Sequence, residues 1–168
     1  ARMVKREDLT DDLMKMWFEP PAEFQTFKPG QYCTIGVNGI ERPYSIASAP
    51  HEPLVELFFE LVPNKFRTPT SLTPQIWELH EGDHVTMRPK AKGTFLLDES
   101  ASVLCHSMIA TVTGIAPFVS MLRALANGYY QHLHIDPDYC FDPGCSFYVY
   151  HGASYYNEFG YYDELMSL

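Results

Sequence analysis

Arg42-Pro43-Tyr44-Ser45-Ile46-Ala47-Ser48 places a cation, an aromatic ring and several hydroxyls on one extended segment. Two runs rich in β-forming residues, 31–37 and 40–48, flank the dipeptide Asn38-Gly39, which favours the type I′ turn of a two-residue hairpin. Side chains alternate along a strand, so Arg42 and Tyr44 share one face while Ser45 takes the other. The pattern predicts a β-hairpin whose second strand presents these groups.

The groups on this strand suit a dinucleotide that carries a flat ring. A guanidinium fork such as that of Arg42 binds pyrophosphate oxygens through paired hydrogen bonds, and the ring of Tyr44 offers a face for stacking. Ser45 could hydrogen-bond a ring nitrogen from the edge of the strand. A flavin dinucleotide has these features. For an isolated occurrence of the motif, the alternative is a surface strand with a solvated arginine.

The order of further motifs along the chain resembles that of the ferredoxin–NADP reductase family of flavoproteins. In chain order, the motifs around the Arg42 stretch are Phe27-Lys28-Pro29-Gly30-Gln31-Tyr32, Gly82-Asp83, Lys92-Gly93-Thr94-Phe95 and Thr113-Gly114-Ile115-Ala116-Pro117-Phe118. The resemblance runs from about Met14 to the last residue. It implies an FAD-dependent oxidoreductase that transfers electrons between NAD(P)H and a one-electron protein carrier such as ferredoxin or flavodoxin.

The resemblance also implies which residues form the site. Tyr44 would stack on the flavin ring and Ser45 would lie near its reactive nitrogen, so these two are the expected catalytic residues. The expected cofactor-binding residues are Arg42, Pro43, Tyr44, Ser45, Phe58, Ser71, Leu72, Thr73, Thr113, Gly114, Ala153 and Ser154. NADP or NAD would be the co-substrate, and no metal ligand is expected.

Three positions depart from the family pattern. Val112 stands where a Thr-Gly-Thr-Gly loop has a glycine, and Thr70 replaces a glycine before the phosphate-binding segment. Ser154 stands where many members have an arginine that binds the 2′-phosphate of NADP. A serine can still donate a hydrogen bond, so the choice between NADP and NAD stays open.

Two other functions fit the same residues. One is an NADH-dependent reductase component of an oxygenase system, which uses the same two lobes. The other is a non-catalytic flavin-binding sensor or regulatory subunit, a reading that Val112, Ser154 and the early end of the chain motivate.

Strand runs and turns in the first hundred residues predict an antiparallel β barrel. The runs 14–18, 31–37, 42–48, 55–62 and 84–89 are separated by breaks rich in proline and glycine. We expect a six-stranded barrel of the Greek-key type, with the run 55–62 buried on most of both faces. One short helix is expected at 72–79, with Thr73 as its N-cap and Pro74 at its first position. Such a helix start offers free N–H groups to phosphate.

After about residue 100 the pattern changes to strand, tight turn, helix and strand. The stretches 107–112 and 147–151 predict two parallel strands, 117–128 predicts a helix with an apolar stripe, and 158–165 predicts a second helix. This order is the start of an α/β Rossmann-like lobe. We therefore expect an FAD-binding barrel domain at 1–99 and the N-terminal part of an NAD(P)-binding domain at 100–168, with the rest of that lobe missing from this chain.

Composition limits partners and location. The 168 residues carry 12 basic and 21 acidic side chains, and this net charge of -9 disfavours nucleic acid as a partner. No run reaches the ~18 apolar residues of a membrane span, and the N-terminus lacks an apolar signal core. We expect a cytoplasmic protein with no membrane span.

Cysteines and histidines show no metal-site spacing. Cys33, Cys105, Cys140 and Cys145 are expected to be reduced thiols, with a disulfide between the last two as the alternative. His132 and His134 alternate with leucine, which indicates a strand or loop more than a ligand set.

Overall fold

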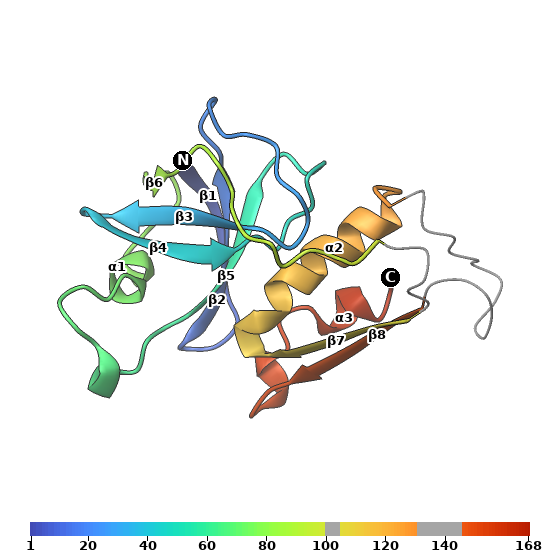
Figure 1. Cartoon of the computed structure of the whole chain (residues 1–168). Helices are drawn as coiled ribbons and strands as arrows, with labels where there is room; N and C mark the ends of the chain where they lie inside the picture. The colour runs from blue at the N-terminus through green and yellow to red at the C-terminus, as the bar shows by residue number, and fades with distance from the viewer. Residues whose placement is uncertain (100–104, 131–145) are drawn as a thin grey trace.

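A computed structural model describes residues 1–99, 105–130 and 146–168 (Figure 1). The strands in these ranges are β1 (Arg2–Asp8), β2 (Leu13–Glu19), β3 (Tyr32–Val37), β4 (Ile40–Ser45), β5 (Val55–Glu60), β6 (Thr86–Met87), β7 (Cys105–Thr111) and β8 (Ser146–Gly152). The helices are α1 (Thr73–Trp77), α2 (Ala116–Ala126) and α3 (Tyr162–Leu165), and short 3-10 turns lie at Asn64–Phe66, Val112–Ile115 and Tyr156–Glu158. The expectations for His132, His134, Cys140 and Cys145 concern positions outside the described residues.

The strands before residue 99 form two antiparallel sheets of three strands each. One has the order β1-β2-β5 and the other β4-β3-β6. Single bridges join them at both ends, since Ile46 after β4 pairs with Leu57 on β5, and Arg2 on β1 pairs with His84 just before β6. These bridges connect the two three-stranded sheets, in agreement with the expected antiparallel barrel.

The predicted hairpin is confirmed. β3 and β4 pair antiparallel from Tyr32 opposite Ser45 to Val37 opposite Ile40. Asn38 and Gly39 have φ values of 49° and 81°, and the type I′ turn needs positive φ at both of its central residues. The strand ends at Ser45 and not at Ser48, because the chain leaves β3 there to make the bridge to β5.

Strand β5 is buried on both faces, as predicted, because it lies between the barrel core and the second unit. Val55, Leu57 and Phe59 point into a core that also holds Met3, Met14, Met16, Phe18, Ile35 and Ile46. Phe58 points the other way and packs with the residues of the second unit. This alternation places one face of β5 at the junction between the two units.

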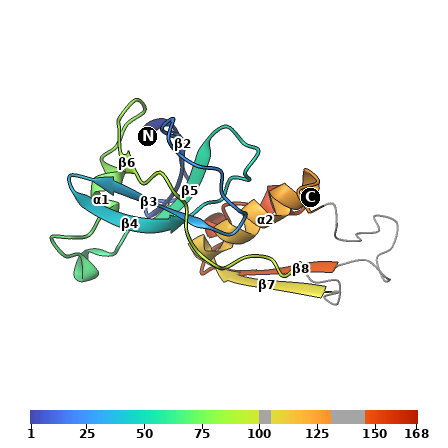
Figure 2. The ribbon, with the colours of Figure 1, turned by 45° about the horizontal axis from the view of Figure 1, so that its top comes forward.

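The second unit begins with the predicted strand, turn, helix and strand. β7 and β8 pair in parallel, with Cys105 opposite Ser146 and Thr111 opposite Gly152. Helix α2 packs against this sheet, because Met121 of the helix shares an apolar cluster with Met108 of β7 and Val149 of β8. Figure 2 shows the helix running between this sheet and the barrel. The helix predicted at 158–165 was too long, because the segment forms the 3-10 turn and the single-turn helix α3 instead.

A shared apolar cluster joins the two units. It contains Leu13, Ala47 and Phe58 from the barrel, and Ala110, Ile115, Ala116, Val119 and Tyr161 from the second unit. Gly30 makes a second close approach, since a Cβ there would lie 2.2 Å from the carbonyl oxygen of Phe95 and 2.4 Å from Cε of Met121. The barrel and the first turn of the second unit are thus packed directly on each other.

In the ranges that the structure describes, no helix combines the length and apolarity required to cross a bilayer. The same ranges hold no group of three or more histidine, cysteine, aspartate or glutamate side chains that could bind a metal ion.

Candidate functional site

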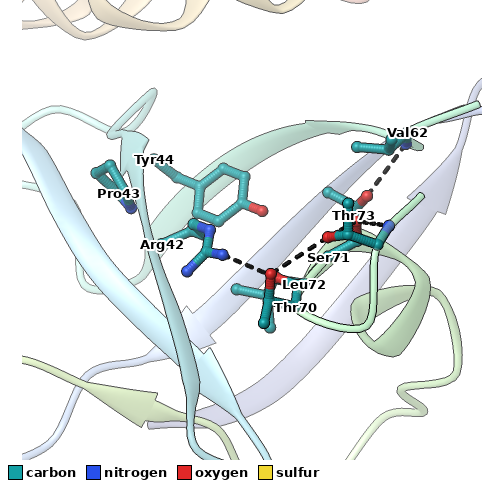
Figure 3. A pocket seen from close by; sticks show the side chains of 9 residues that line it. Arg42, Pro43, Tyr44, Val62, Thr70, Ser71, Leu72 and Thr73 are labelled. Carbon is teal, nitrogen blue, oxygen red and sulfur yellow. Dashed lines mark hydrogen bonds between the residues drawn. The ribbon is translucent and has the colours of Figure 1, made fainter. Parts of the chain in front are cut away.

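A pocket of about 310 Å³ lies between β4 and the segment that leads into α1 (Figure 3). Its lining consists of Arg42, Pro43, Tyr44, Val62, Thr68, Thr70, Ser71, Leu72 and Thr73. Six of the expected cofactor-binding residues are among them: Arg42, Pro43, Tyr44, Ser71, Leu72 and Thr73. Alternation along β4 explains why the guanidinium and the ring meet on one wall, because they lie two residues apart.

The guanidinium of Arg42 is already oriented by the backbone. Its Nη2 donates to the carbonyl oxygen of Thr70 at 2.8 Å, and its Nη1 donates to that of Glu41 at 2.7 Å. An arginine has five N–H donors, so further donors are left for an anion in the pocket. The first bond also ties β4 to the loop on the facing wall.

Tyr44 stands half-buried at the rim of the barrel core. Its ring meets the ring of Phe59 edge-on, with the centroids 4.7 Å apart. Burial raises the pKa of Tyr44 to about 12, although the nearby charge of Arg42 opposes this shift. The phenol is therefore a neutral hydrogen-bond donor at physiological pH, on a ring whose position is set by packing.

The loop on the facing wall carries three hydroxyls close together. The Oγ1 atoms of Thr68 and Thr70 lie 3.2 Å apart, and Oγ of Ser71 accepts a hydrogen bond from the N–H of Thr68 at 2.9 Å. Hydroxyls that are both donors and acceptors suit phosphate oxygens. Thr70 replaces the usual family glycine, yet here its carbonyl oxygen is the acceptor that holds Arg42.

The expectation that Thr73 caps α1 was wrong. Thr73 is the first helical residue, Leu72 holds the cap position, and no side chain caps the helix. The hydroxyl of Thr73 instead accepts a hydrogen bond from the N–H of Val62 at 3.1 Å, which closes the loop 62–73. Pro74 consequently stands at the second helical position.

Ser45 and Phe58 do not line this pocket. Ser45 lies on the opposite face of β4, where it pairs with Tyr32. The ring of Phe58 is 4% exposed and packs edge-on against Tyr161 at a centroid distance of 5.5 Å. Their expected roles at the cofactor stay predictions to which the pocket adds no support.

Thr113 and Gly114 lie in a separate place, on the 3-10 turn between β7 and α2. Gly114 is exposed, as a residue that approaches a ligand needs to be. Val112 just before them has a φ of 41°. The backbone therefore adopts the left-handed conformation that a glycine at this position would allow without strain.

Ala153 and Ser154 follow the end of β8, away from the pocket. The N–H groups of Ser154 and Tyr155 both donate to Oε2 of Glu158, at 2.7 and 3.1 Å. Sequence reasoning did not assign a role to Glu158. The capping-box spacing, an acidic residue three positions after the start of a helical turn, was the signal that could have found it.

Comparison with known proteins identifies the chain's relatives. No family model matches it. Over 132 residues, 76% of this chain, it is 32% identical to the flavodoxin/ferredoxin–NADP reductase of Buchnera aphidicola subsp. Baizongia pistaciae. It is 30% identical over 127 residues to the enzyme of the same name from Escherichia coli strain K12, which covers 73% of this chain. The chain belongs to the ferredoxin–NADP reductase family.

Solved structures agree with the fold of that family. A ferredoxin NADP+ reductase from Neisseria gonorrhoeae, crystallised with bound FAD and NADP, superposes with a TM-score of 0.79 at 23% identity, over 99% of this chain and 62% of that one. The chain spans about half the length of the two curated relatives, 50% and 48%. The structural likeness therefore extends over both the barrel and the second unit of this chain.

Proposed function

We propose that this chain is the flavin-binding part of an oxidoreductase that passes electrons between NAD(P)H and a one-electron protein carrier such as ferredoxin or flavodoxin. The observation that carries the proposal is the pocket that brings together the guanidinium of Arg42, the ring of Tyr44 and the hydroxyls of Thr68, Thr70 and Ser71. A cation with free donors, clustered hydroxyls and an aromatic face are the groups that a pyrophosphate beside a flat ring requires.

The relatives support the same reaction. The curated proteins carry the name flavodoxin/ferredoxin–NADP reductase, and the Neisseria gonorrhoeae structure contains FAD and NADP. We extend these ligands to this chain because its donor set fits them: the pocket holds a fixed positive charge, whereas the chain as a whole has a net charge of -9.

Each residue then has a role that its position allows. Arg42 and the hydroxyls of the loop bind the pyrophosphate of FAD, and Tyr44 stacks on the flavin ring. The role of Ser45 near the reactive nitrogen of the ring stays a prediction from the family resemblance, because Ser45 does not line the pocket. Bound FAD accepts two electrons from a nicotinamide dinucleotide and releases them one at a time. Thr113 meets the flavin where the two units join, and Gly114 lets the backbone approach the pyrophosphate of the nicotinamide dinucleotide.

The extent and location of the units complete the proposal. We propose residues 1–99 as the FAD-binding unit and 100–168 as the first part of the NAD(P)-binding unit. The cytoplasmic location expected from the sequence stays a prediction, which fractionation of cells and detection of the protein with an antibody would test.

The test is cofactor retention by the intact protein. We expect a yellow protein with flavin absorbance, which loses the colour on partial denaturation and regains it when FAD is added back. A colourless protein that FAD cannot reconstitute would contradict both enzyme functions and the sensor function. FMN, which lacks the AMP half of FAD, and ADP-ribose, which has the pyrophosphate but lacks the flavin ring, are the matched control ligands.

Reduction under anaerobic conditions then separates the rival functions. Bleaching of the flavin by NADPH supports the reductase of ferredoxin or flavodoxin, and bleaching by NADH alone supports a reductase component of an oxygenase system. Retention of FAD without bleaching by either nucleotide supports the sensor or regulatory subunit.

A further inference from the structure

Glu56 is a charged side chain buried at the junction of the two units. The residue is 1% exposed and lies on β5. Its Oε2 accepts a hydrogen bond from Nη1 of Arg123 at 2.6 Å, and its Oε1 accepts one from the hydroxyl of Tyr161 at 2.8 Å. A buried carboxylate is tolerated only where partners neutralise it. Glu56 therefore requires hydrogen-bond donors, one of them positively charged, beside this face of the barrel.

Arg123 supplies the charge from helix α2. Its Nε and Nη2 donate to the two carboxylate oxygens of Glu164 at 2.5 and 2.9 Å, and Glu52 lies 3.5 Å from its Nη1. Burial alone would lower the pKa of Arg123, but its hydrogen bonds to Glu164 and the charge of Glu56 raise it. A paired fork of this kind fixes direction as well as distance.

Tyr161 completes the set from the segment before α3. Its side chain is 2% exposed, and Nζ of Lys15 on β2 lies 4.6 Å from the centre of its ring. Burial and the charge of Glu56 raise the pKa of Tyr161 well above its ordinary value. The phenol therefore keeps its proton and remains a donor to Glu56.

The same junction holds the strand that carries the flavin motif. Ser120 on α2 donates its hydroxyl to the carbonyl oxygen of Ser48 at 2.7 Å, and the carbonyl oxygen of Ala47 accepts from Nη1 of Arg123 at 3.4 Å. Ala47 comes two residues after Ser45, and Ile115, which shares a buried cluster with it, comes two residues after Thr113. Both halves of the proposed reaction site are therefore anchored within two residues of this junction.

We propose that Glu56, Arg123, Tyr161 and Glu164 form an inter-lobe clamp that sets the position of the Thr113-Gly114 turn relative to the flavin strand β4. These four are positioning residues for electron transfer, and the inference rests on the proposed function. Each acts through the backbone segments that it holds, and none of them lines the flavin pocket.

The charged groups of the clamp indicate that its role is to fix the relative orientation of the two units. Apolar side chains of similar volume often hold two surfaces together as well as a buried ion pair does. An apolar contact, however, fixes direction less strictly than paired hydrogen bonds do. A test must therefore keep the two units attached while it removes the directional bonds.

The first experiment measures backbone amide hydrogen exchange. The clamp variants are the double variant Glu56→Leu/Arg123→Met and the single variant Tyr161→Phe. The control is Arg2→Met, which removes an exposed ion pair with Glu19. We expect exchange in peptides covering 45–49 and 111–116 to be at least about tenfold faster in the clamp variants, and the double variant, which replaces both charges, should keep a thermal unfolding midpoint close to the wild-type value. Unchanged exchange in both peptides would overturn the clamp. This readout requires no cofactor.

The second experiment measures flavin reduction by the nicotinamide dinucleotide in the intact protein loaded with FAD. We expect FAD affinity within about twofold of wild type, and a rate at saturating dinucleotide that falls at least about tenfold, because a displacement of roughly 1 Å can cost about a hundredfold in rate. A full rate in the double variant would overturn the inference. If the wild-type protein fails to bind FAD, the proposed function fails, and the exchange measurement alone decides the clamp.

Discussion

Nε2 of His151 lies 2.9 Å from the carbonyl oxygen of Val112, so the end of β8 is bonded to the residue that follows β7. This contact holds in place a β-branched residue whose φ is 41°. Valine is rare in this left-handed region, because its branched side chain crowds the backbone there. The turn Val112–Ile115 thus has a glycine-like conformation at a position without a glycine.

Replacing Val112 by glycine should stabilise the protein. The strain of such a residue costs about 1–3 kcal/mol, and the extra backbone entropy of glycine offsets about 0.5–1 kcal/mol of the gain. The difference of these two terms is about 0–2.5 kcal/mol, so we expect Val112→Gly to raise the free energy of unfolding in urea by about 1 kcal/mol, near the middle of that range. Val112→Ala loses the same methyl groups but keeps Cβ, so it should be the less stable of the two variants. The opposite order would show that the turn is unstrained.

Loss of the Arg42 guanidinium should weaken the binding of FAD. A charge-assisted hydrogen bond to the pyrophosphate is worth about 1.5–3 kcal/mol, which corresponds to a Kd roughly 10- to 150-fold higher for Arg42→Ala. Flavin fluorescence during titration measures this Kd. Arg2→Ala, which removes an exposed arginine elsewhere on the barrel, should leave it unchanged. Equal affinities for wild type and Arg42→Ala would refute the assigned role.

The ring of Tyr44, and not its hydroxyl, should carry most of its contribution to flavin binding. Tyr44→Phe keeps the ring and its edge-on contact with Phe59, so FAD affinity should change by less than about 0.5 kcal/mol. Tyr44→Ala should lose about 0.5–1.5 kcal/mol of stacking energy, seen in the same titration. A loss in Tyr44→Phe as large as that in Tyr44→Ala would shift the role to the hydroxyl.

A side chain at Gly30 should separate the barrel from the second unit. Its φ of 95° already disfavours other residues, and a Cβ would meet the carbonyl oxygen of Phe95 at 2.2 Å. We expect Gly30→Ala to lower the free energy of unfolding by about 2–4 kcal/mol, as the sum of backbone strain and overpacking. Gly39 has a φ of 81° with nothing near its Cβ position, so Gly39→Ala should cost only about 1 kcal/mol. Equal losses in the two variants would mean that the neighbours of Gly30 yield freely.

His106 should make the protein less stable in mild acid. Its Nε2 is buried without a hydrogen-bond partner among the described residues, and its ring stacks on Phe147. Burial lowers the pKa of His106 below its ordinary 6.5, although Asp98 opposes the shift. The unfolded chain therefore binds this proton first, and the free energy of unfolding falls as the pH drops below 6.5.

The variant His106→Phe isolates this contribution, because phenylalanine keeps the stacked ring and cannot be protonated. Chemical denaturation at about pH 8 and about pH 5 should show a smaller acid loss in His106→Phe than in wild type. The same substitution at the exposed His51 serves as the control. An identical loss in His106→Phe and wild type would exclude His106 as its source.

Much of the fold was predictable because local signals and tertiary structure agree. Asn38-Gly39 sets a turn that only one hairpin register satisfies, and the run 55–62 is apolar because both of its faces are covered. β1 was missed since only Met3 among its residues is fully buried, and the charged positions around it give no readable alternation. It pairs with β2, which follows directly after residues 9–12, and its other neighbour, His84, is distant in sequence.

The site was predictable to the extent that one strand defines it. Arg42 and Tyr44 share a wall by simple alternation, and the resemblance added the loop before α1. The hydroxyl of Thr73 does not cap α1, because it accepts a hydrogen bond from the N–H of Val62 instead. Arg123 follows Glu56 by 67 residues and Tyr161 follows it by 105, so no local pattern could reveal that the three form one buried set.

Tyr161 lies between the barrel and the second unit, and this position determines where the chain can be truncated. Truncation of the chain near residue 99 would remove Arg123 and Tyr161, the hydrogen-bond partners of the Glu56 carboxylate, and would expose Phe58 to water. We therefore expect that the barrel does not fold independently of the second unit. Differential scanning calorimetry should record one melting endotherm for the whole chain.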